Sequence, residues 1–74
     1  MTADSSKDAR ARAIDRLPTS YAVALRLRDA GAADDVIASG LGIEAVSLPA
    51  LLELAEAKLA AILRQERDLH NGLT

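Results

Sequence analysis

The sequence predicts a small all-α protein, and three features of its composition support that fold class. Alanine and leucine together make up 28 of the 74 residues, and both are strong helix formers. Phenylalanine and tryptophan are absent, so a sheet would lack the bulky side chains that fill its faces. There is no cysteine, so neither disulfides nor thiolate zinc ligands reinforce the core. We therefore expect a four-helix domain with a thin core and a long C-terminal helix.

The first expected helix covers residues 7–16, after a polar N-terminal arm. Ser5 or Ser6 is placed to cap it. Pro18 follows closely, and the residue before a proline is driven out of α geometry. Residues 1–16 are therefore expected to form a separate arm and helix in front of the main domain.

The second helix is expected from residue 18 to about residue 30, because proline suits the first turn of a helix. Gly31 then supplies a left-handed C-terminal stop. A short third helix follows, and Asp34 or Asp35 either caps it or lies at its positive N-terminal end. This third helix is expected to stop near Gly40.

The last helix has the clearest pattern in the sequence. Ser47 is placed to cap it, and Pro49 falls in its first turn, where a missing N–H costs little. Apolar residues then recur every three or four positions, as in a helix with one buried face. They are Leu48, Leu51, Leu52, Ala55, Leu59, Ile62 and Leu63. The helix is expected to run toward His70, so that residues 17–70 form the main domain and residues 71–74 a frayed tail.

Residues 34–52 also fit a helix-turn-helix, in which a second helix crosses closely over a first. Ala38 is small enough for the crossing, and Gly42 tolerates the positive φ of the turn. The expected framework residues are Ile37, Ala38, Leu41, Gly42, Ile43 and Leu48. An ordinary helical hairpin is the alternative reading of this pattern.

From Leu17 to Leu63 the chain resembles region four of bacterial RNA polymerase sigma factors. The matching residues are Leu17-Pro18, Ala30-Gly31, Ile37-Ala38, Leu41-Gly42-Ile43, Leu48, Leu52, Ala55 and Leu59. The resemblance implies a compact helical domain whose last helix enters the major groove of the −35 promoter element. It also implies contacts with polymerase and with transcriptional activators.

The positions that carry DNA-contacting side chains in that family hold different residues in this chain. They are Pro49, Ala50, Leu51, Glu53, Leu54, Glu56 and Ala57. Residues 32–59 contain five acids and one base, a local charge of −4, although the whole chain carries only −2. Because phosphate neutralisation dominates affinity for nucleic acids, this segment should bind a duplex poorly.

The outward face of the last helix offers a second surface for packing another helix. Ala50, Leu54, Ala57 and Ala61 are spaced by four, three and four residues, opposite the apolar stripe. The candidate DNA or partner face comprises Ser47, Ala50, Glu53, Leu54, Ala57, Lys58 and Ala61. A solvated alanine-rich helix without a partner is the alternative.

Basic residues lie mainly outside this segment. The candidate contacts to phosphate or to an acidic partner are Arg10, Arg12, Arg26, Arg28 and Arg64. The alternative is a set of solvated side chains that are partly paired with the acids beside them.

These patterns predict a protein that is not an enzyme and has no cofactor. His70 is the single histidine, so a transition-metal site is not expected, and no spacing suggests a catalytic triad. No apolar run approaches the length of a membrane span, and we expect a cytoplasmic protein. Two functions remain open: a transcription-associated module with weak or partner-assisted binding to duplex DNA, and a module that binds a protein partner or forms a homodimer.

Overall fold

The computed structural model describes the backbone of residues 2–72 and the side chains of residues 8–67. Four α-helices and one 3₁₀ turn make up this part of the chain, and no strand occurs in it. They are α1 (Thr2–Asp15), α2 (Thr19–Asp29), α3 (Asp34–Leu41), η1 (Ala45–Ser47) and α4 (Leu48–Gly72). The fold is therefore all-α with a long C-terminal helix, as the composition predicts.

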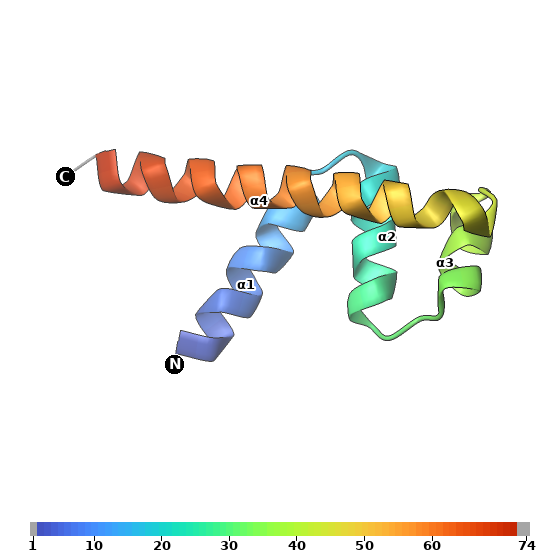
Figure 1. Ribbon diagram of the computed structural model, residues 1–74. Coiled ribbons are helices and arrows are strands. Elements are labelled where there is room, and N and C mark those ends of the chain that lie inside the picture. The colour runs from blue at the N-terminus through green and yellow to red at the C-terminus, as the bar shows by residue number, and fades with distance from the viewer. Residues whose placement is uncertain (1, 73–74) are drawn as a thin grey trace.

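Helix α4 runs along the length of the molecule, and the other three helices lie on one side of it (Figure 1). Its 25 residues span about 37 Å at the usual rise of 1.5 Å per residue. The molecule is elongated, with extents of 46 × 23 × 15 Å. Because α1, α2 and α3 share one side, the opposite side of α4 faces outward along most of its described length.

Helix α1 begins earlier than the sequence suggests, at Thr2 and not near residue 7. Ser5 and Ser6 lie inside its backbone and do not precede it, so the expected cap is wrong. Of the five residues added to the helix only Ala3 is a strong helix former, so local propensity does not account for the earlier start. The helix ends at Asp15, just before Pro18, which is the N-cap residue of α2 with φ −53° and ψ 149°.

Helices α2 and α3 both end at a glycine in the left-handed region, with φ 90° at Gly31 and 72° at Gly42. After α2, the Gly31 N–H donates to the Arg28 carbonyl and the Ala32 N–H to the Leu27 carbonyl, each at 3.0 Å. This pair of backbone hydrogen bonds is the Schellman motif, which satisfies carbonyls at the end of a helix.

The same motif closes α3, where the Gly42 N–H donates to Ser39 and the Ile43 N–H donates to Ala38. The helix therefore ends one residue beyond Gly40, which lies within it. At the other end of α3 the N-cap is Ala33, and no side chain caps the helix. Asp34 and Asp35 occupy its first turn, where negative charge is favourable beside the helix dipole.

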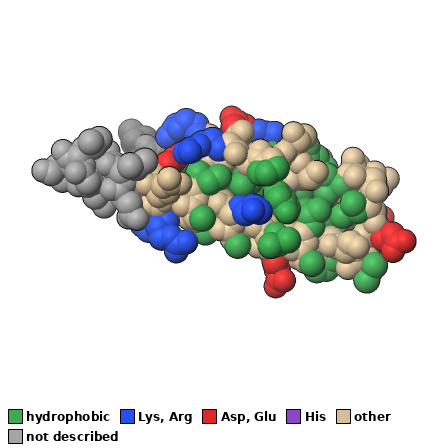
Figure 2. Space-filling view, turned by 90° about the horizontal axis from the view of Figure 1, so that it is seen from above, with side chains coloured by type: hydrophobic (Ala, Val, Ile, Leu, Met, Phe, Trp, Pro, Cys, Tyr) green, Lys and Arg blue, Asp and Glu red, His purple; other side chains and the backbone are tan. Residues whose placement is uncertain are grey.

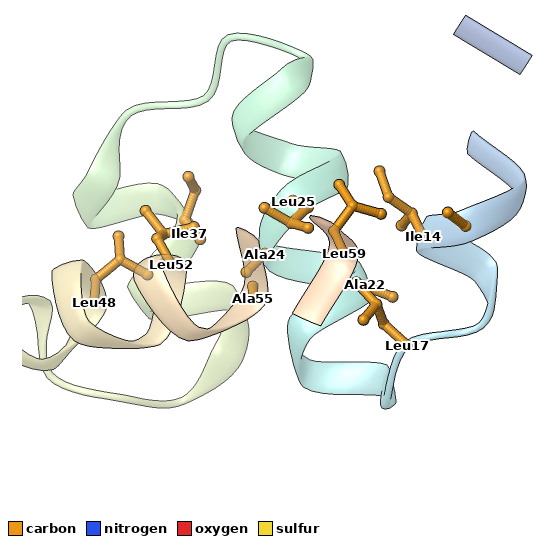
Figure 3. Packing of buried hydrophobic residues seen from close by; sticks show 11 residues of the cluster. Ile14, Leu17, Ala22, Ala24, Leu25, Ile37, Leu48, Leu52, Ala55 and Leu59 are labelled. Atoms are coloured by element: carbon orange, nitrogen blue, oxygen red, sulfur yellow. The ribbon is translucent and has the colours of Figure 1, made fainter. Parts of the chain in front are cut away.

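All four helices contribute to one hydrophobic core (Figure 3). Its largest fully buried side chains are Leu25, Ile37, Leu48 and Leu59. Small residues complete it, namely Ala13, Ala22, Ala24, Ala38 and Ala55, together with Ile14, Leu17 and Leu52. Because α1 contributes Ala13 and Ile14, its C-terminal half packs into the same core as the residues that follow. The alanines allow the helices to approach closely, which keeps the core thin.

Candidate functional site

The junction between α3 and α4 brings the expected framework residues together. Ile37 and Leu48 belong to the same buried cluster, against which the half-buried Leu41 and Ile43 pack, and Ala38 is also buried. Gly42 makes the turn with its positive φ, and a 3₁₀ turn then leads into α4. This 3₁₀ turn was not expected, because three residues of turn carry no periodic signal in a sequence.

The outward face of α4 consists of exposed side chains with an apolar centre. Ala50, Leu54, Ala57 and Ala61 are all exposed, on the side of α4 opposite its buried stripe. Leu54 keeps 53% of its surface accessible, and Val46, in the turn before α4, keeps 81%. Figure 2 looks down on this side of α4, where hydrophobic side chains gather with charged ones interspersed. We call Ala50, Leu54, Ala57 and Ala61, with the flanking Glu53 and Lys58, the outward face.

The two charges that flank the outward face differ in their surroundings. The Lys58 ammonium lies 5.7 Å from the centre of the Tyr21 ring, within the range of a cation–π contact. Glu53 is exposed and makes no ion pair with the side chains that the structure describes. Ser47, the last residue of η1, is exposed just before α4. Both Glu53 and Lys58 are exposed, although the Lys58 ammonium already has the Tyr21 ring as a partner.

Three of the five candidate arginines form ion pairs within the protein. Arg10 Nε and Nη2 donate to both carboxylate oxygens of Asp29, at 2.9 and 3.1 Å. Arg10 Nη2 also lies 3.2 Å from Glu56 Oε2, and Arg28 Nη1 lies 3.4 Å from the same oxygen. Arg26 pairs with Asp15. These contacts join α1, α2 and α4 across the surface of the bundle.

Arg10 is the centre of this network. Its hydrogen bond to Asp29 raises the pKa of the guanidinium above its already high value, and Glu56 adds to the effect. Arg10 therefore keeps its charge at every pH at which the protein folds. A phosphate group would have to compete with two carboxylates for Arg10.

Arg12 and Arg64 differ from the other three candidate arginines. Both are exposed, and neither forms an ion pair with a side chain among residues 8–67. They lie on different helices, α1 and α4. The five arginines thus do not form one continuous free basic surface.

An open cleft of about 550 Å³ lies between α1 and α2. It is lined by Arg10, Ala11, Ile14, Asp15, Arg26 and Asp29. Its charges are paired with one another, Arg10 with Asp29 and Arg26 with Asp15. The apolar part of the cleft lining, Ala11 and Ile14, is therefore accompanied by two ion pairs.

Neither a cluster of metal ligands nor a membrane-spanning helix occurs in the described part of the chain. No group of three or more histidine, aspartate or glutamate side chains there is arranged to hold a metal ion. None of the helices in that part combines the length and apolar character needed to cross a membrane. The side chain of His70 and residues 73–74 of the expected tail lie outside the described residues, whereas residues 71 and 72 belong to α4.

Comparisons with protein-family models, curated proteins and solved structures found no match. The candidate site therefore has to be interpreted from its own chemistry.

Sequence reasoning missed the ion-pair network and the cleft. Arg10 lies 19 residues from Asp29 and 46 residues from Glu56, so no local pattern connects them. The sequence offered one signal for these ion pairs, namely that acidic and basic residues occur on helices that were expected to pack against one another. It does not identify which arginine meets which acid.

Proposed function

We propose that this chain is a non-enzymatic protein-binding module that receives another helix on the outward face of α4. The observation that carries the proposal is the exposed apolar centre of that face, where a folded domain usually keeps polar side chains. Alanines at three of its four central positions let a partner helix approach closely. Leu54 supplies the large apolar side chain that a small interface needs at its centre.

The energetic gain from such an interface is modest. Burying the exposed part of Leu54 stabilises a complex by roughly 2 kcal/mol, at about 25 cal/mol per Å² of apolar surface. A contact along a few turns of one helix lies at the small end of protein interfaces. We therefore expect weak, reversible binding with an affinity in roughly the micromolar range.

Electrostatics argue against duplex DNA as the main ligand of this face. The five acids and one base between residues 32 and 59 would meet the phosphate backbone with net repulsion. Arg10, Arg26 and Arg28 are already paired with carboxylates. Alanine and leucine lack the donors and acceptors that read base edges.

A transcription-associated helix-turn-helix with weak or partner-assisted DNA binding is the second candidate function. It is supported by the left-handed Gly42 and the buried Ala38, two of the residues on which the resemblance to sigma factor region four rests. In this reading Arg12 and Arg64 contact phosphates beside a protein partner that supplies most of the affinity. The two functions share the framework and differ in what the outward face binds.

A photo-crosslinking amino acid at position 57 tests the proposed function in the cells that produce the chain. The matched control places the same amino acid at Ala33, an exposed alanine in the loop between α2 and α3. That loop lies at the end of the two helices far from α4 (Figure 1). We expect protein adducts from position 57 and few from position 33. Equal adducts from both positions, or none from either, would contradict the proposal.

Fluorescence anisotropy with a duplex of mixed sequence tests the second function. We expect no binding at roughly 50 μM protein in low salt, because a protein that neutralises few phosphates binds non-specifically with weak affinity. Tight binding that falls steeply with added salt would make DNA the main ligand instead.

A further inference from the structure

The outward face repeats with the spacing of a two-stranded coiled coil. Its central positions 50, 54, 57 and 61 alternate steps of four and three residues, as the seam of a coiled coil does. Glu53 directly precedes the central Leu54, and Lys58 directly follows the central Ala57. At 100° per residue, the acid and the base therefore lie on opposite flanks of the seam.

The placement of these two charges distinguishes a parallel pair from an antiparallel one. In a parallel pair of identical helices, a residue that precedes the seam on one helix lies beside the residue five positions later on the other helix. Glu53 and Lys58 are five positions apart, so each glutamate would meet the lysine of the other chain. An antiparallel pair would bring glutamate near glutamate and lysine near lysine, which is unfavourable.

We infer that the occupant of the outward face is a second copy of this chain, with the two α4 helices parallel and in register. The inference rests on the proposed function and adds the partner and its orientation. Charge complementarity over residues 50–61 supports it, because the symmetric pair contains two Glu53–Lys58 contacts between the copies. Arg64, the next seam position, would lie opposite its own copy, so the paired segment ends before it. The bundle leaves room for it, because α1, α2 and α3 all pack on the other side of α4 (Figure 1).

Single cysteines test the orientation, since the chain has none of its own. The variants Ala50→Cys and Ala61→Cys each place a thiol opposite its own copy in a parallel pair, and both should form disulfide-linked dimers in a glutathione buffer. In an antiparallel pair centred between residues 54 and 57, identical cysteines would lie about 16 Å apart along the axis. Such a pair would cross-link only when the two variants are mixed, and that result would overturn the parallel register. Ala33→Cys is the control for random collisions.

Charge reversal tests the pairing of Glu53 with Lys58. Glu53→Lys and Lys58→Glu should each weaken self-association roughly tenfold, and the double variant should restore it. Sedimentation equilibrium of the pure chain measures the association, and circular dichroism verifies that each variant keeps its helicity. Loss in the double variant equal to the sum of both single losses would refute the pairing.

A chain that keeps its monomer mass of 7.8 kDa up to roughly 500 μM, with cross-linking no greater than the Ala33→Cys control, would overturn the inference. The adducts from position 57 separate this failure from failure of the proposed function. An adduct at twice the monomer mass supports the second copy. An adduct of another mass leaves protein binding in place and rejects the second copy as the occupant.

Discussion

Leu25→Ala removes one of the largest fully buried side chains, at the centre of the core shared by α2 and α4 (Figure 3). A leucine-to-alanine change at such a site costs about 2–5 kcal/mol, because buried surface is lost and a cavity remains. A domain of 74 residues has a total stability of roughly 4–11 kcal/mol. A loss of about 3 kcal/mol would therefore lower Tm by roughly 12–24 °C.

The matched control is Leu54→Ala, which makes the same change of side chain at an exposed position of α4. Leu54 is 53% exposed, so the deletion opens no cavity, and we expect a change in unfolding free energy within about 0.5 kcal/mol. Urea unfolding followed by far-ultraviolet circular dichroism, at low protein concentration to avoid self-association, measures both values. Equal losses in the two variants, or no loss for Leu25→Ala, would refute the assignment of the core.

Two further predictions use matched pairs of residues. Gly42→Ala should cost about 1–2 kcal/mol of unfolding free energy, because alanine is strained at φ 72°. Gly40→Ala, in a helix where a new Cβ would make only an ordinary 3.7 Å contact with Leu27, should stabilise the protein by up to about 1 kcal/mol. Equal melting temperatures for the two variants would contradict this. Glu56→Gln should lose about 1 kcal/mol or less at low salt, because it removes a partly exposed carboxylate that meets two arginines, and the difference should vanish near 1 M NaCl. Glu53→Gln, its control, should unfold like the parent chain at both salt concentrations when the protein is dilute enough to be monomeric, because Glu53 forms no ion pair with the described side chains of its own chain.

The helices and their ends could be read from the sequence where the signals are local. Pro18, Gly31 and Gly42 act through their own backbone geometry, and each falls at a helix boundary in the structure. The start of α1 could not be predicted in the same way. No proline or glycine marks this boundary, and local helix propensity does not account for it.

The candidate site likewise has one part that local sequence patterns predicted and one part that they did not. The outward face of α4 follows from helical periodicity, so its exposed centre was predictable once the buried stripe was recognised. Whether each arginine is free or paired with a carboxylate was not predictable from the sequence. Solvated arginines and paired arginines have the same sequence pattern, and only the packing of α1 and α2 against α4 brings Arg10 to Asp29 and Glu56.

By itself, then, the sequence determined the all-α class, the buried stripe of α4 and the apolar face opposite it. These properties depend on residues within a few positions of one another, whose relation a helix sets directly. The tertiary structure decided which charges remain available, because ion pairs between helices depend on where distant segments meet. It also decided that α1 shares the core with the rest of the bundle, since Ala13 and Ile14 find their partners only after the chain has folded back at Pro18.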